Sequence, residues 1–226
     1  MNRPIPPHAG QPVLSGGAPL AQAAAAVIMI HGRGAGPGNI MELTPAIGHP
    51  AAACLAPAAA GGTWYPQSFL APTEENEPGI GSGIAVVHGL IELVLGAGIP
   101  AERIMLLGFS QGACLAATAA QRRPDRYGGV MVFSGGLIGP PGTAWSERGD
   151  FRSTPVFFGC SDRDAHVPEP RVRESAAVFE RMGALVTTRI YPGMGHLVNQ
   201  DEMAFARELL AGLALPVRDA GARGGA

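Results

Sequence analysis

The stretch RIMLLGFSQGACLAATAAQ, residues 103–121, decides the fold. Residues 103–107 are almost entirely apolar, whereas residues 111–121 are rich in alanine. This pattern is typical of a short buried strand followed by a helix. Between the two lies GFSQG (108–112), a Gly-x-Ser-x-Gly sequence. Such a sequence between a strand and a helix indicates a tight turn that exposes a serine hydroxyl at the edge of a sheet. We therefore take Ser110 as a candidate nucleophile.

The segments around this stretch repeat the alternation of strand and helix. Short apolar runs, typical of buried strands, alternate with longer runs of helical periodicity. The expected strands are 25–30, 51–56, 103–107, 128–133, 154–158 and 185–191, and the expected helices are 83–95, 111–121, 171–182 and 202–213. This order predicts an α/β fold with a mostly parallel central sheet and helices on both faces. Functional residues of such sheets lie beyond the carboxyl ends of the strands.

A serine nucleophile needs a base, and the base needs a carboxylate partner. His196 ends the run YPGMGH (191–196), which follows the last expected strand. Asp162 and Asp164 both follow the strand at 154–158. The residues alone leave both aspartates open, and we expect the unused one to pair with Arg163 or with solvent. The chain order is then Ser, Asp, His, as this kind of fold requires.

The first expected strand ends in HGRGAG (31–36), a glycine-rich turn. A turn of this kind places a backbone N–H near the serine, and the helix after Ser110 supplies a second. We expect the amides of Arg33 and Gln111 to form an oxyanion hole. His31 is expected to be structural. His8, His49 and His88 are interpreted as surface or helix residues.

Composition excludes several classes of protein. The chain has 226 residues, 46% of them hydrophobic and 15% charged, which is typical of a single globular domain. The formal net charge is −2 and the basic residues are scattered, so we expect neither nucleic-acid binding nor attraction to acidic membranes. The three cysteines predict no disulfide framework and no zinc site, and no metal or organic cofactor is expected.

The two ends of the chain differ from its centre. Residues 1–17 are rich in proline and glycine and are expected to form an extended leader or an edge hairpin. Residues 18–213 hold the expected domain, and residues 214–226 have few large apolar groups and predict a flexible tail. The apolar run 18–30 lacks a signal-peptide architecture and is too short to cross a bilayer. We therefore expect a cytoplasmic protein without stable membrane insertion.

Taken together, these motifs resemble the phospholipase/carboxylesterase family of α/β-hydrolases, which includes bacterial carboxylesterases and acyl-protein thioesterases. The matching stretches are VIMIHGRGA (27–35), TWYPQSFLAPTEENEPGI (63–80), IPAERIMLLGFSQGACLA (99–116), FSGGLIGP (133–140), DAHVP (164–168) and YPGMGH (191–196). The resemblance implies an α/β-hydrolase fold. The acid of this family belongs to a D-x-x-V-P run, which Asp164 matches and Asp162 does not.

The resemblance also implies the catalytic roles of Ser110 and His196 and the oxyanion roles of the Arg33 and Gln111 amides. Trp64 and Tyr65 are expected to wall the acyl or alcohol pocket. Acyl-protein thioesterases usually have a leucine-type residue where this chain has Arg33, and their acid loop opens with His-Gly where this chain has Cys160-Ser161. The chain is thus more similar to compact bacterial esterases.

The expected function is a serine carboxylesterase that acts on small-molecule esters of short to medium acyl length, because the sequence shows no large cap insertion between residues 133 and 164. An acyl thioesterase or lysophospholipase of the same fold is the first alternative. A dienelactone-hydrolase-like enzyme would have cysteine in place of Ser110. A non-catalytic binding protein on a hydrolase scaffold is the alternative from a different class. The sequence leaves a homodimer open.

Overall fold

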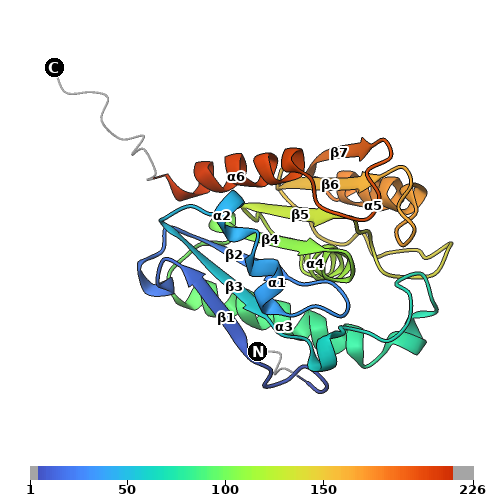
Figure 1. The fold of residues 1–226 in the computed structure, drawn as a ribbon, viewed down its shortest axis with the longest axis horizontal. Helices are drawn as coiled ribbons and strands as arrows, with labels where there is room; N and C mark the ends of the chain where they lie inside the picture. Colours follow the sequence, from blue (N-terminus) through green and yellow to red (C-terminus); the bar gives the residue numbers. More distant parts are fainter. Residues whose placement is uncertain (1–4, 216–226) are drawn as a thin grey trace.

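The computed structural model of the protein describes residues 5–215. Seven strands form one sheet in the order β1-β3-β2-β4-β5-β6-β7, in which only β1 is antiparallel to its neighbour (Figure 1). The strands are β1 (Val13–Gly17), β2 (Ala25–Ile30), β3 (Ala52–Pro57), β4 (Ile104–Phe109), β5 (Gly129–Phe133), β6 (Pro155–Ser161) and β7 (Leu185–Tyr191). The expectation of a mostly parallel sheet is confirmed.

Helices cover both faces of this sheet. They are α1 (Pro37–Met41), α2 (Thr44–Ile47), α3 (Gly79–Gly96), α4 (Gln111–Arg122), α5 (Glu169–Arg181) and α6 (Gln200–Ala214). Short 3₁₀ turns lie at Leu20–Gln22, Ala60–Gly62, Thr73–Asn76 and Ala101–Arg103. Helices α3, α4 and α5 pack on one face, and α1, α2 and α6 pack on the other. The five inner strands, β2 to β6, are therefore buried on both sides, which explains why their sequences are continuous apolar runs.

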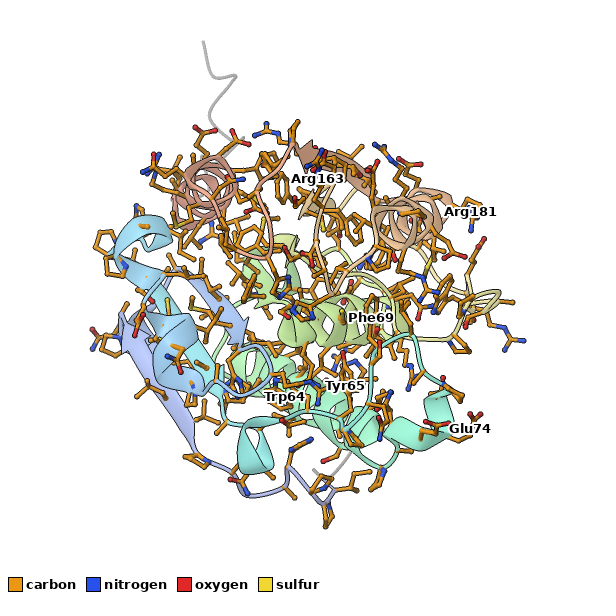
Figure 2. The ribbon with its side chains drawn as sticks, turned by 45° about the vertical axis from the view of Figure 1, so that its right-hand side comes forward. Trp64, Tyr65, Phe69, Glu74, Arg163 and Arg181 are labelled. Carbon is orange, nitrogen blue, oxygen red and sulfur yellow. The ribbon has the colours of Figure 1, made fainter. Side chains whose placement is uncertain are left out.

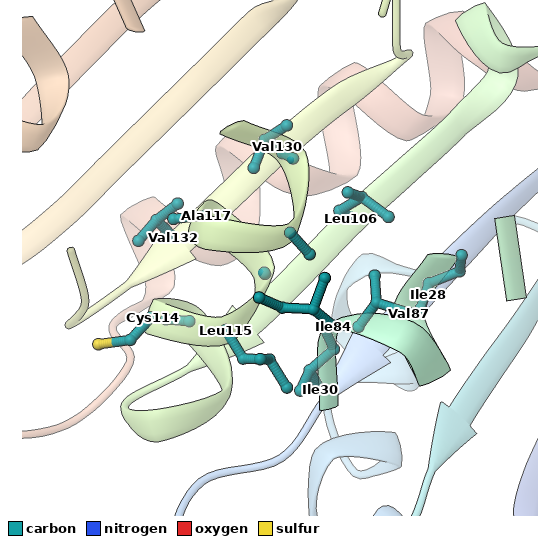
Figure 3. Packing of buried hydrophobic residues seen from close by; sticks show 14 of the residues in the cluster. Ile28, Ile30, Ile84, Val87, Leu106, Cys114, Leu115, Ala117, Val130 and Val132 are labelled. Atoms are coloured by element: carbon teal, nitrogen blue, oxygen red, sulfur yellow. The ribbon is translucent and has the colours of Figure 1, made fainter. Parts of the chain in front are cut away.

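Alternate residues of each strand supply the two halves of the core. Ile28 and Ile30 of β2 face α3 and α4, whereas Val27 and Met29 face the opposite layer. Figure 3 shows the first half, in which strand side chains meet residues of α3 and α4 such as Ile84. This period of two is the geometry of a pleated strand.

Helix α3 is long and apolar enough, by length and composition, to cross a membrane, and 56% of its 18 residues are buried inside the protein. Its buried residues belong to the core beside β2 and α4, and a core helix of this kind meets the same criteria. No other helix within residues 5–215 meets them.

The sequence predicts an extended leader or an edge hairpin at one end of the domain and a flexible tail at the other. Strand β1 lies inside the segment 1–17 and pairs with β3, so part of the leader belongs to the sheet as an edge strand. At the other end α6 continues to Ala214. The flexible tail expected from there falls mostly on residues 216–226, which lie outside the described part of the chain.

Candidate active site

Ser110 occupies a strained turn between β4 and α4. Its φ is 56° and its ψ is −121°, a left-handed conformation that is uncommon for a residue other than glycine. The two motif glycines make the turn possible. A Cβ atom at Gly108 would overlap the carbonyl of Gly112, and one at Gly112 would overlap the carbonyl of Ile30 on β2. The motif therefore encodes a close approach of three backbone segments that lifts the Ser110 side chain off the sheet.

His196 lies in the loop between β7 and α6, and its imidazole contacts the serine. The Nε2 atom is 2.8 Å from the Ser110 Oγ, and the Nδ1 atom is 2.7 Å from the Oδ2 of Asp164. Because a carboxylate only accepts hydrogen bonds, Nδ1 donates to Asp164 and Nε2 accepts from the Ser110 hydroxyl. The imidazole ring also contacts the rings of Phe109 and His166, at centroid distances of 5.0 and 4.7 Å.

The Asp164 side chain is fully buried and lies in the loop after β6. Its Oδ1 accepts the backbone N–H of His166 at 2.8 Å and that of Val167 at 3.0 Å. Burial by itself would raise the pKa of Asp164, but the hydrogen bonds from His196 and from these two amides outweigh it and keep the pKa below its ordinary value. The carboxylate is thus ionised and faces the imidazole at neutral pH.

Asp162, the other aspartate of the loop, does not reach the imidazole. Its Oδ1 accepts the backbone N–H of Gly193 at 2.7 Å, and the Ser161 Oγ accepts that of Gly195 at 3.0 Å. The expected partner of the unused aspartate was Arg163 or solvent; Asp162 is exposed to solvent, and it also binds the loop that carries His196. The acid loop and the histidine loop are therefore tied together at two points outside the Ser-His-Asp contact itself.

The oxyanion hole expected from the sequence involves Arg33 and Gln111, and both residues line the pocket at Ser110. The turn after β2 passes directly against the serine, because a Cβ atom built on Gly32 would lie 3.4 Å from the Ser110 Cβ. Within residues 5–215 neither the backbone N–H of Arg33 nor the backbone N–H of Gln111 donates a hydrogen bond. Two backbone donors beside the hydroxyl are thus available to a ligand.

A pocket of about 830 Å³ opens at Ser110 and His196. One wall is apolar and comes from α1, from the segment after it and from the loop before α6, with Ile40, Leu43 and Leu197 as members. The opposite wall comes from the segment after β3 and includes Tyr65 and Phe69. A volume of this size suits a small organic ligand.

Trp64 differs from the expectation that it walls this pocket. Its side chain is fully buried and is absent from the pocket lining, and its Nε1 donates to the carbonyl of His31 at 2.9 Å. Tyr65 does line the pocket. The amide side chain of Gln111 binds both residues, accepting from the Trp64 N–H at 2.9 Å and donating to the Tyr65 carbonyl at 2.8 Å. Trp64 therefore lies behind the wall that Tyr65 lines, and Figure 2 labels the two residues next to each other.

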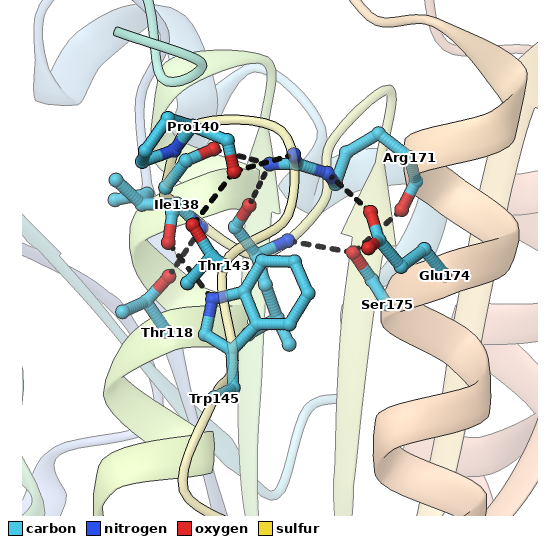
Figure 4. Close-up of polar contacts among 10 residues, drawn as sticks. Thr118, Ile138, Pro140, Thr143, Trp145, Arg171, Glu174 and Ser175 are labelled. Atoms are coloured by element: carbon cyan, nitrogen blue, oxygen red, sulfur yellow. Dashed lines mark hydrogen bonds and ion pairs between the residues drawn. The ribbon is translucent and has the colours of Figure 1, made fainter. Parts of the chain in front are cut away.

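Arg171 of α5 lies beside Phe69 of the same wall, and Figure 4 shows the polar contacts that hold Arg171 in place. Its guanidinium is almost fully buried, donates to the carbonyls of Leu137 and Gly139 at 3.0 and 2.6 Å, and lies 5.1 Å from the centre of the Trp145 ring. It also lies 5.9 Å from the centre of the Phe69 ring, which lines the pocket. Residues 134–154, between β5 and β6, form neither helix nor strand, so no helical cap covers the site from there.

Glu202 of α6 is a buried carboxyl that the sequence analysis did not single out. Its side chain is fully buried, its Oε2 accepts the Asn199 N–H at 2.8 Å, and its Oε1 has no partner within residues 5–215. Burial raises its pKa to about 7. The Asn-x-x-Glu spacing of a helix capping box was the available signal, but that spacing does not reveal burial.

Two further observations concern histidines and metals. His8, interpreted from the sequence as a surface residue, is buried and bonded to the Trp64 carbonyl at 2.9 Å. His31 is buried as well, and its Nε2 accepts the Ala59 N–H at 3.1 Å, in keeping with a structural role.

Among residues 5–215 no group of three or more His, Cys, Asp or Glu side chains is arranged to hold a metal ion.

Comparison with known proteins shows similarity to one family of hydrolases. The family described as Phospholipase/Carboxylesterase matches residues 17–213. A solved phospholipase/carboxylesterase from Dyadobacter fermentans is 38% identical, with a TM-score of 0.85, and the match covers 89% of this chain and 97% of that one. A probable carboxylesterase of Oryza sativa is 30% identical over 61% of this chain and 51% of its own length.

Acyl-protein thioesterase 1 of Gibberella zeae is 32% identical over 60% of each chain. The match spans only about half to three fifths of the length of these two curated relatives. The family match itself covers nearly all of the domain. The chain therefore belongs to the phospholipase/carboxylesterase family of hydrolases.

Proposed function

We propose that the chain is a serine esterase that hydrolyses carboxylic esters of short to medium acyl length through an acyl-enzyme on Ser110. The observation that supports this most directly is the continuous hydrogen-bond chain from the Ser110 Oγ through His196 to Asp164, with distances of 2.8 and 2.7 Å. A serine hydroxyl becomes a nucleophile when a base accepts its proton and a carboxylate holds that base in the correct tautomer.

In the first half of the reaction, the Ser110 Oγ attacks the ester carbonyl while its proton moves to Nε2 of His196. The carbonyl oxygen becomes an oxyanion, which the N–H groups of Arg33 and Gln111 stabilise. When the intermediate collapses, the bond to the alcohol oxygen breaks, and the alcohol leaves with the proton from Nε2. Asp164 stays ionised throughout and stabilises the imidazolium that forms between these steps.

In the second half, water replaces the alcohol. His196 accepts one proton of the water as its oxygen attacks the acyl-enzyme carbonyl, and the oxyanion forms again beside the same two amides. Collapse breaks the bond to the Ser110 Oγ, which recovers its proton from His196. The products are the free acid and the regenerated serine.

The preference for short to medium acyl chains rests on the shape of the site. The pocket measures about 830 Å³, with apolar side chains such as Ile40 and Leu197 on one wall. The segment 134–154, where a cap could be inserted, contains no helix. A pocket without a cap buries a small acyl group but leaves part of a long chain in water, where it gains no further binding energy.

A thioesterase is the second candidate, because several relatives, including that of Gibberella zeae, are named acyl-protein thioesterase 1. The same triad and oxyanion hole would serve a thioester, since only the leaving atom differs. A matched oxoester and thioester distinguish the esterase from the thioesterase. The two substrates carry the same acyl group and the same group on the oxygen or sulfur. A larger kcat/KM for the thioester, after correction of both substrates for spontaneous hydrolysis, would favour the thioesterase.

The test of the esterase is turnover of a series of p-nitrophenyl esters from acetate to dodecanoate, together with labelling by a fluorophosphonate. We expect short esters to be hydrolysed and the label to be found on the peptide that contains Ser110. Ser110→Ala should lose label and turnover, whereas Ser15→Ala, on the exposed edge strand β1, should keep both. Turnover by Ser110→Ala at the rate of the parent would refute the mechanism. Absence of turnover and of label in the parent would favour the non-catalytic binding protein.

A further inference from the structure

The side chains that line the pocket carry an unbalanced charge. Arg33 is the one lining residue with a permanent charge, and the described lining includes no aspartate or glutamate. The carboxylate of Asp164 is fully buried behind His196 and is not part of the pocket surface. A neutral ester has no use for a cation at this place, so the charge points to something other than the ester group.

The Arg33 guanidinium is held in a fixed position. Its two terminal nitrogens donate to the carbonyls of Pro66 and Gln67, at 2.8 and 2.5 Å, on the opposite wall of the pocket. Within residues 5–215 it makes no ion pair with a carboxylate. A guanidinium has five N–H groups, so these two bonds leave donors and the whole positive charge available.

Tyr65 lies beneath this cation. Its ring lines the pocket, and the Arg33 guanidinium lies 5.9 Å from the centre of that ring. The Tyr65 hydroxyl is fully buried beside the thiol of Cys114 and presents no surface to the pocket. A cation over an aromatic face is held in place without losing its charge or its free N–H groups.

From this uncompensated cation, we propose that Arg33 forms a subsite for a carboxylate carried by the substrate, so that the preferred esters are anionic. A carboxylate here accepts hydrogen bonds from the guanidinium and neutralises the charge of the pocket. This inference rests on the proposed esterase function, and it adds a substrate class to it. The carboxylate belongs either to the acyl part or to the alcohol part of the ester.

The test compares esters that differ only in this charge. For the acyl side, the pair is the mono-p-nitrophenyl ester of adipic acid and the same ester with the free carboxyl converted to a primary amide. For the alcohol side, the pair is 3-acetoxybenzoate and 3-acetoxybenzamide. In each pair the readout is the ratio of kcat/KM, anionic over neutral. We expect a ratio of roughly three to ten in one pair, the size typical of a partly exposed ion pair.

Variants assign the preference to the subsite. Arg33→Leu keeps the backbone amide but removes the charge, and it should bring the ratio close to one. Arg33→Lys should keep most of the ratio, because the charge remains. The matched control is Arg181→Leu, which removes the same charge from an exposed position on α5 outside the pocket. Its ratio should equal that of the parent. Because each ratio is internal to one variant, a general loss of rate cancels.

Three outcomes would overturn the inference. A ratio near one in both pairs, with the neutral esters still hydrolysed, would remove the carboxylate subsite and leave the esterase function in place. A ratio that survives Arg33→Leu would trace the preference to another part of the protein, and one that falls equally in Arg181→Leu would trace it to net charge. No turnover of any of the four esters, with Ser110 unlabelled by a fluorophosphonate, would remove the proposed function and this inference together.

Discussion

Replacing Glu202 by glutamine should make the folded protein more stable at neutral and alkaline pH. The Glu202 side chain is fully buried, and its Oε1 has no partner within residues 5–215. A Cβ atom at Gly159 would overlap this oxygen, so the carboxyl lies directly against the backbone of β6. Glutamine has nearly the same shape and keeps an oxygen for the Asn199 N–H, but it has no charge to bury.

The size of the effect follows from the shift in pKa. The pKa of Glu202 is raised from 4.5 to about 7 by burial. Between these values the folded state holds a proton that the unfolded state has released, so the free energy of unfolding falls as the pH rises through this window. Below pH 4.5 the penalty is absent, and above about pH 7 it is constant. A shift of this size is equivalent to roughly 3 kcal/mol, of which about 2 kcal/mol develops between pH 5 and pH 8.

The assay is urea denaturation of the parent and of Glu202→Gln at pH 5, 6, 7 and 8. The variant should gain stability relative to the parent by about 2 kcal/mol from the lowest to the highest pH. Glu208→Gln is the control, because it removes a charge from an exposed position of the same helix and should stay within about 0.5 kcal/mol of the parent. A gap between Glu202→Gln and the parent that does not change with pH would refute the reasoning.

Three further predictions concern the turn, the acid loop and a thiol. Gly112→Ala places a Cβ on the carbonyl of Ile30 and should destabilise the fold by about 3 kcal/mol or more in urea denaturation; wild-type stability would contradict the steric argument. Asp164→Asn should lower kcat on p-nitrophenyl acetate by about 10³ or more. Asp162→Asn keeps its acceptor oxygen and should lose less than about tenfold in kcat. Equal losses in the two variants would contradict the assignment of the acid. Burial raises the pKa of the Cys160 thiol to about 12. Mass spectrometry should therefore find Cys160 alkylated by iodoacetamide only after denaturation. Rapid labelling of Cys160 in the native protein would contradict its burial.

The elements that were predicted well are those whose burial is visible in a short run of sequence. The strand expected at 25–30 coincides with β2, and the helix expected at 111–121 is one residue shorter than α4. Helix α3 begins four residues before the expected start at 83, at Gly79. Glycines at a helix start suggest a loop, yet here they are required by packing, because a Cβ at Gly79 would crowd the Trp64 carbonyl.

The residues that were predicted wrongly are positioned by contacts between segments that are distant in the sequence. His8 binds the Trp64 carbonyl, 56 residues away, and nothing near His8 in the sequence reveals that it is buried. Trp64 was placed on the pocket wall because of its neighbours in the chain, but its indole turns toward the His31 carbonyl behind that wall. Alternation and spacing report on an element's own faces, whereas these side chains are positioned by another element.

The hydrogen bond between Ser110 and His196 joins residues 86 positions apart, and two further strands, β5 and β6, lie between their strands in the sheet. Closing so long a loop is slow compared with forming a helix. During refolding, the far-ultraviolet signal of the helices should therefore return before Ser110 regains its reactivity toward a fluorophosphonate. The delay between the two signals would measure the duration of the last stage of folding, in which β4 and β7 reach their final places in the sheet.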